Sequence, residues 1–194
     1  TCKKIAMASR IFLLDRSGSM ETCWDDTIGG YNAFIREQAP FGGDMTLIFF
    51  DHEYAGAYVR RPMGEVEPLT RETYKPRGST ALLDAIGRTI KEWEDETPPT
   101  VIILTDGLEN ASTKFTKAHI KDLIDAKTKE GWQFVYLGAN QDAFAEARSI
   151  GIGAGHTLNF ETSRTPDVFR AVSAALSQQA STNSPELNLH TQVL

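Results

Sequence analysis

Oxygen-bearing side chains gather directly after the first apolar run of the chain, residues 11–14. The segment Asp15-Arg16-Ser17-Gly18-Ser19-Met20 brings one carboxylate and two hydroxyls close together. Hard divalent cations prefer oxygen ligands, and Mg²⁺ takes only a few of them from the protein. The segment therefore predicts part of a cation site. Taken alone it is equally compatible with a simple helix cap, because Asp and Ser are preferred residues before the first turn of a helix.

Two further oxygen donors follow at places that a folded sheet brings to the same edge. Thr80 opens a predicted helix, and Asp106 comes directly after the apolar run 101–104. Ligand sites of open α/β sheets lie outside the carboxyl ends of the strands. Three oxygen-rich loops at one edge favour a metal site over a helix cap.

Apolar runs that alternate with amphipathic segments predict the sheet that positions these loops. Strands are expected at residues 5–14, 45–50, 54–60, 101–104, 134–137 and 156–160, and helices at 23–38, 81–94, 117–130, 142–150 and 165–179. The pattern predicts an α/β fold with a doubly wound, mostly parallel central sheet of about six strands, flanked by helices on both faces. Residues 54–60 are expected as an antiparallel edge strand. Residues 1–180 are predicted to form a single domain and residues 181–194 a polar, poorly ordered tail.

The motif Asp15-x-Ser17-x-Ser19, with Thr80 at a helix start and Asp106 after a hydrophobic strand, resembles a known metal site. This is the metal-ion-dependent adhesion site (MIDAS) of von Willebrand factor A (vWA) domains, also called integrin I-like domains. The order and spacing of the elements resemble this Rossmann-like fold over nearly the whole chain. Stand-alone domains of this kind are common in bacteria and their phages, so we expect a bacterial or phage origin.

The resemblance implies a role for each of the five residues. Ser17 and Ser19 would bind the metal directly through their hydroxyls. Thr80 would bind directly or through water, and Asp15 and Asp106 largely through bridging waters. The implied ion is Mg²⁺ or Mn²⁺. Because few protein charges then reach the cation, it stays electrophilic and can bind an Asp or Glu of a partner protein. The implied function is therefore a metal-dependent protein-protein interaction module.

Three other features carry separate expectations. Arg16 occupies the variable position inside the first motif, where its charge either favours an anionic partner or weakens metal binding. Asp51-His52-Glu53 offers further ligand atoms, although a polar turn between strands collects the same residue types for backbone reasons. His119 and His156 each stand alone in their segments, so we assign them no metal or catalytic role.

The composition of the 194-residue chain is that of an ordinary globular protein, with 41% hydrophobic and 24% charged residues and a net charge of -6. The negative charge and the lack of a Lys/Arg cluster argue against nucleic-acid binding. No segment has the character of a membrane span or a signal-peptide core. Cys2 and Cys23 imply no disulfide framework, which suits a reducing compartment. We expect a cytoplasmic protein that binds neither nucleic acid nor membrane.

Two alternative functions stay open. A Mg²⁺-dependent phosphatase or another hydrolase would use Asp15 as its nucleophile. Against this, no second carboxylate follows Asp15 two residues on, no Gly-Lys-Ser/Thr phosphate loop occurs, and no His accompanies a Ser at a strand-to-helix elbow. A scaffold that folds this way without metal is the other alternative, and the complete ligand set argues against it. We favour the non-catalytic interaction module, with an ATPase or a multi-protein assembly as the expected setting of its partner.

Overall fold

The computed structural model describes residues 9–94, 97–139, 142–182, 184 and 187–189. Its strands form one six-stranded sheet in the order β3-β2-β1-β4-β5-β6. The strands are β1 (Ser9–Asp15), β2 (Asp44–Phe50), β3 (Tyr54–Pro62), β4 (Thr100–Thr105), β5 (Gln133–Ala139) and β6 (Thr157–Phe160). The α-helices are α1 (Trp24–Gln38), α2 (Leu82–Glu92), α3 (Lys117–Lys129), α4 (Ala143–Ser149) and α5 (Thr165–Thr182). Short 3-10 helices are η1 (Gly18–Cys23), η2 (Ala39–Phe41), η3 (Met63–Glu65), η4 (Ala154–His156) and η5 (Thr162–Arg164). The predicted α/β fold is confirmed, while residues 5–8 of the first expected strand lie outside the described residues.

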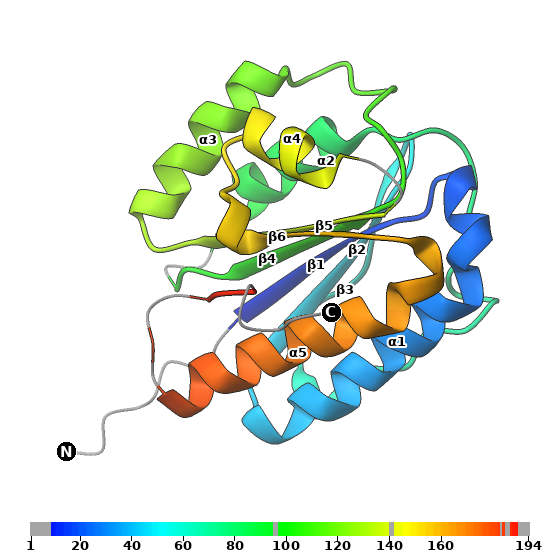
Figure 1. The fold of residues 1–194 in the computed structure, drawn as a ribbon, viewed down its shortest axis with the longest axis vertical. Helices are drawn as coiled ribbons and strands as arrows, with labels where there is room; N and C mark the ends of the chain where they lie inside the picture. The colour runs from blue at the N-terminus through cyan, green and yellow to red at the C-terminus, as the bar shows by residue number, and fades with distance from the viewer. Residues whose placement is uncertain (1–8, 95–96, 140–141, 183, 185–186, 190–194) are drawn as a thin grey trace.

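Helices cover both faces of the sheet, with α1 and α5 on one face and α2, α3 and α4 on the other (Figure 1). Phe12 and Leu14 of β1 enter the core under α1 and α5, whereas Ile11 and Leu13 enter the core under the other three helices. All four side chains are fully buried, because successive residues of a strand point to opposite faces. This two-sided burial explains why the first strand is continuously apolar. None of the described helices is both long and apolar enough to cross a membrane.

The direction of the strands decides where the loops meet. All strand pairs are parallel except β2 and β3, which pair antiparallel at the edge of the sheet, as predicted. In the β1–β4 pair Leu14 lies opposite Leu104, so the two chains leave the sheet side by side. The loops that contain Ser17 and Asp106 therefore start from neighbouring points on the same edge.

Two adjacent glycines in α1 need a packing reason, since each costs about 1 kcal/mol in a helix relative to alanine. A Cβ atom at Gly30 would overlap the ring of Phe169 on α5, whereas a Cβ atom at Gly29 would meet nothing within 4 Å. The sequence suggests close packing of this helix against the sheet. The close approach is instead between α1 and α5, and it explains Gly30 but not Gly29.

Two leucines of the segment after α5 pack against the domain. Leu187 and Leu189 are 2% and 0% exposed and join the core on the α1–α5 side of the sheet. The backbone N–H of Leu189 also donates a hydrogen bond of 3.0 Å to the carbonyl oxygen of Gly155. The prediction of a poorly ordered tail is wrong for these two leucines, because burying their side chains compensates for the cost of ordering the chain. The remaining residues of the tail after 189 lie outside the described residues, and the domain boundary at residue 180 stays a prediction.

Candidate metal centre

Asp15 is the last residue of β1, and its carboxylate is completely buried. Its Oδ1 accepts a hydrogen bond of 2.6 Å from the backbone N–H of Ser17, and its Oδ2 accepts one of 2.6 Å from Thr105 Oγ1. Burial raises the pKa of Asp15 to about 6, although the hydrogen bonds from Thr105 and Ser17 lower it in part. An ionised carboxylate at this position is therefore costly unless a positive charge lies close to it.

The hydroxyls of Ser17, Ser19 and Thr80 surround a single point next to Gly107. A Cβ atom at Gly107 would lie 2.8 Å from Thr80 Oγ1, 3.4 Å from Ser19 Oγ and 3.6 Å from Ser17 Oγ. The two serine hydroxyls also share a hydrogen bond of 3.1 Å. Gly107 thus leaves a space that three oxygen donors face, and such a space suits a small hard cation.

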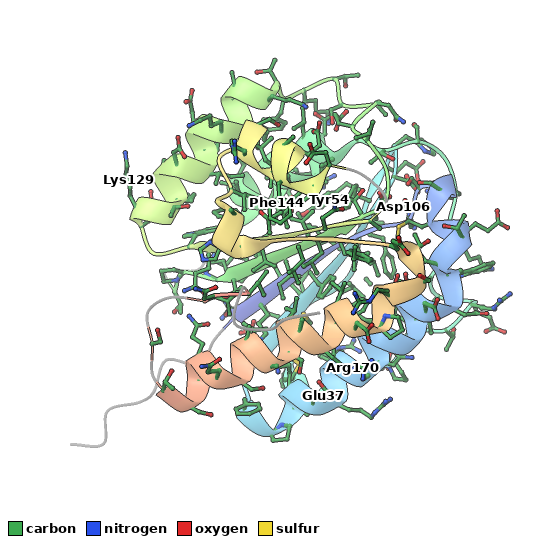
Figure 2. All side chains as sticks on the ribbon, viewed as in Figure 1. Glu37, Tyr54, Asp106, Lys129, Phe144 and Arg170 are labelled. Atoms are coloured by element: carbon green, nitrogen blue, oxygen red, sulfur yellow. The ribbon has the colours of Figure 1, made fainter. Side chains whose placement is uncertain are left out.

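Asp106 adds a second carboxylate to the cluster. Its Oδ1 accepts a hydrogen bond of 2.6 Å from Ser19 Oγ. Burial raises the pKa of Asp106, while the hydrogen bond from Ser19 lowers it, and the charge of Asp106 makes a small contribution to the raised pKa of Asp15. Figure 2 labels Asp106 at the edge of the sheet, close to the start of α1. The structure thus brings all five residues of the predicted site together at this edge.

Thr80 is 2% exposed and is held by its backbone. Its N–H donates a hydrogen bond of 2.9 Å to Asn110 Oδ1, and its carbonyl oxygen accepts bonds from the N–H groups of Asn110 and Ala111 at 3.0 and 3.1 Å. Gly18 N–H donates a bond of 3.0 Å to the carbonyl oxygen of Gly78, which joins the first motif to the same loop. The loop before α2 therefore connects the two other loops of the site.

Tyr74 and Thr105 support Asp15 from outside the predicted set. The fully buried Tyr74 hydroxyl donates a hydrogen bond of 2.6 Å to the carbonyl oxygen of Asp15. Thr105 Oγ1, besides donating to Asp15, accepts a bond of 3.1 Å from the N–H of Gly107. Sequence reasoning missed both residues, as it missed Asn110, because contacts between distant loops leave no periodic signal. Only Thr105 had a local signal in the sequence, because its hydroxyl stands at the end of an apolar strand, one residue before Asp106.

Asp51 is fully buried and pairs with two arginines. Arg16 Nε and Arg77 Nε donate to its Oδ2 at 2.8 and 2.9 Å, and Arg77 also pairs with Glu53. Ligand atoms of Asp51, His52 and Glu53 lie within 4.8 Å of one another, but the arginines already engage the first and third. This arrangement favours the polar-turn interpretation of residues 51–53. The Asp51 carboxylate also compensates the charge of Arg16. Arg16 should therefore attract an anionic partner, or weaken metal binding, less than an unpaired arginine would.

Two carboxylates hold the loop that follows Asp106. Glu109 accepts hydrogen bonds of 2.9, 3.0 and 2.7 Å from the N–H groups of Leu83, Ala111 and Ser112. Asp84 accepts bonds of 3.0, 2.9 and 3.0 Å from the N–H groups of residues 113, 114 and 115. The loop is thereby fixed to the first turn of α2, which limits how far Gly107 can move relative to Thr80.

No protein-family profile and no curated protein matches the chain. Its fold does match solved structures. Proximal thread matrix protein 1 (PTMP1) from the mussel byssus has a TM-score of 0.63 and 17% identity, over 86% of this chain and 45% of that protein. Another PTMP1 structure, described as having a zinc-occupied MIDAS motif, has a TM-score of 0.60 and 16% identity, over 86% of this chain and 46% of the other. The vWF domain of the type V pili tip protein Mfa5 from Porphyromonas gingivalis has a TM-score of 0.65 and 11% identity, over 90% and 96% of the two chains. The chain spans less than half of PTMP1 and nearly the whole of the Mfa5 domain.

Proposed function

We propose that this chain, which has the fold of von Willebrand factor A domains, is a non-catalytic protein-interaction module that binds an acidic group of a partner through a divalent cation. The observation that carries the proposal is the space at Gly107, which the hydroxyls of Ser17, Ser19 and Thr80 face. Neutral hydroxyls with carboxylates behind them form the all-oxygen environment that hard divalent cations prefer. The site supports this function more directly than the fold does, because a fold by itself does not determine function.

The five residues would share the work between them. Ser17, Ser19 and Thr80 would hold the cation through neutral oxygens, while Asp15 and Asp106 would balance its charge, largely through water. The cation supplies an electrophilic centre with a position for a further oxygen ligand, and a partner Asp or Glu is suited to it. Ser19 is exposed, so this side of the site is accessible to a partner.

The burial and the hydrogen bonds of Asp15 argue against a hydrolase that uses this residue as a nucleophile. A nucleophile must reach the substrate, and Asp15 has no exposed surface. Both of its carboxylate oxygens also accept hydrogen bonds, from Ser17 and Thr105. A scaffold without metal would leave two carboxylates with raised pKa values beside three hydroxyls and no compensating cation, which is an unfavourable arrangement.

We propose Mg²⁺ or Mn²⁺ as the ion, because all the donors are hard oxygen atoms and zinc prefers nitrogen and sulfur ligands. Zinc is named in one PTMP1 structure and therefore belongs among the ions to be tested.

We further propose a protein partner in an assembly or beside an ATPase, with no nucleic acid or membrane involved. Mfa5 and the adhesin SpaC from Lactobacillus rhamnosus GG are pilus proteins, which supports a role in assemblies. A bacterial or phage origin and a cytoplasmic location belong to the same proposal, and the buried free thiol of Cys23 suits a reducing compartment.

Calorimetric titration of the metal-free protein with Mg²⁺, Mn²⁺ and Zn²⁺ tests the site. We expect binding that the double variant Ser17→Ala/Ser19→Ala loses and that the control Ser181→Ala, at an exposed position on α5, retains. Unchanged binding in the double variant would refute the assignment of these ligands. Turnover of p-nitrophenyl phosphate that disappears in Asp15→Asn would refute the non-catalytic function.

A further inference from the structure

A groove of about 690 Å³ lies beside the candidate metal centre, between α2, the start of β3 and the loop after β4. It begins at Ala81, which directly follows Thr80, and runs along α2 as far as Lys91 and Glu92. One wall includes Ala111, whose N–H binds the carbonyl oxygen of Thr80. The groove and the metal centre are therefore parts of one connected surface.

The acidic side chains of the groove are already engaged. Asp84 accepts three backbone hydrogen bonds from the loop, Glu92 pairs with Arg88 at 2.7 Å, and Glu53 pairs with Arg77 outside the groove. The ammonium groups of Lys91 and Lys114 form no ion pair within the part of the chain that the structure describes. The groove therefore has two lysine charges that a negatively charged ligand can neutralise.

Aromatic rings form the apolar part of the groove. Lys91 Nζ lies 4.7 Å from the centre of the Phe115 ring, and Arg88 Cζ lies 4.3 Å from the centre of the Tyr54 ring. Phe115 packs closely on α2 because Gly87 has no side chain, and a Cβ atom there would lie 2.5 Å from the ring. Arg88, Lys91 and Lys114 are exposed, so an acidic group can reach them from solvent, while the rings offer apolar contact to the rest of a bound segment.

We propose that this groove binds a second acidic side chain of the same partner segment that supplies the carboxylate to the metal. This inference depends on the proposed function and adds the partner's chemistry to it: an extended acidic segment with two carboxylates at a defined spacing. The two lysines that form no ion pair among the described residues, and the continuity of the groove with Thr80, select this occupant over a purely apolar one.

The spacing follows from the helix. From Leu82 to Lys91 the axis of α2 rises about 14 Å, at about 1.5 Å per residue. An extended peptide covers this distance in about four residues, at about 3.3 Å each. Lys114 lies nearer to the metal centre, because Asp84 in the first turn of α2 accepts its N–H. The second acidic residue is therefore expected two to four positions from the residue that binds the metal, an estimate based on these rises.

Two synthetic peptides in a Gly/Ser background provide the probes. One has glutamates four positions apart, and the other has glutamine in place of the second glutamate. Binding is followed from backbone amide shifts in ¹H–¹⁵N spectra of the full chain, in Mg²⁺ and in EDTA. We expect the two-glutamate peptide to bind about fivefold more tightly in Mg²⁺, the gain that a favourable exposed ion pair gives. The shifts should include the amides of Lys91, Lys114 and Phe115.

Charge-reversal variants separate the groove from the metal centre. Lys91→Glu and Lys114→Glu should each reduce or abolish the fivefold preference while Mg²⁺ affinity and thermal melting stay unchanged. Lys129→Glu changes the net charge equally at an exposed position at the far end of α3 and should keep the preference (Figure 2).

The experiments distinguish a failure of the groove proposal from a failure of the metal-bridge function. Equal affinity of the two peptides, with Mg²⁺-dependent binding intact, would refute the groove and leave the metal-bridge function standing. Groove shifts that persist while Mg²⁺ has no effect on either peptide would refute the metal-bridge function instead. A dimer in sedimentation experiments that Lys91→Glu or Lys114→Glu dissociates would assign the groove to a second copy of the chain and overturn the inference.

Discussion

The substitution Asp15→Asn tests the electrostatics of the centre most directly. Asp15 is fully buried, and burial raises its pKa from the ordinary 3.8 to about 6. Asparagine keeps the shape of the side chain and removes the charge. Its amide can donate to Thr105 Oγ1, which also lies 3.1 Å from the carbonyl oxygen of Gly107 and can turn its own proton there. The variant should therefore fold.

The sign of the effect follows from proton linkage. Between pH 3.8 and about 6 the unfolded chain releases the Asp15 proton while the folded protein keeps it, so the metal-free protein loses stability as the pH rises through this range. A pKa difference of about two corresponds to about 3 kcal/mol, at about 1.4 kcal/mol per pH unit. At pH 7.5 in EDTA, Asp15→Asn should be more stable than the wild type by about that amount. Mg²⁺ favours the ionised carboxylate and should stabilise the wild type more than the variant.

Urea unfolding of both proteins in EDTA, from pH 4 to 7.5, measures this difference. Titrating groups that do not interact with Asp15 contribute equally to the two proteins and cancel when their unfolding free energies are subtracted. The interaction with Asp106 is the smallest cause of the raised pKa of Asp15. We expect the difference to be smallest at pH 4 and to grow until the pH passes about 6. A difference that does not depend on pH, or a variant that is less stable at pH 7.5, would refute the argument that burial dominates the energy of Asp15.

Glycine substitutions test the packing of the centre and of the helices. Gly107→Ala should lower Mg²⁺ affinity by about tenfold or more, because its Cβ would lie 2.8 Å from Thr80 Oγ1 in the proposed cation space, and calorimetric titration measures this loss. Affinity unchanged by the extra methyl group would contradict the position of the cation. Gly30→Ala should destabilise the protein by about 1–3 kcal/mol in urea unfolding through overlap with Phe169. Its neighbour Gly29→Ala meets no atom and should stabilise α1 by up to about 1 kcal/mol, so equal effects at the two positions would contradict the described packing.

The sequence by itself determined the order of the elements and the side of the sheet on which chemistry occurs. Continuous apolar runs such as residues 101–104 identify strands covered on both faces, and each of them ends in polar residues. In a parallel sheet such ends share one edge, so Ser17 and Asp106 were expected together without any coordinates. Local patterns carried this information because periodicity and strand ends are properties of neighbouring residues.

Only the tertiary structure decided what surrounds that edge. Asp51 compensates Arg16 from a distance of 35 residues along the chain, and Tyr74 holds the backbone of Asp15 from an irregular loop. The tertiary structure also places Leu187 in the core, although the sequence predicts a polar tail at this position. Such contacts join residues far apart in sequence, so they have no period and no fixed spacing from which they could be predicted. The three-dimensional packing alone aims three hydroxyls at the space beside Gly107.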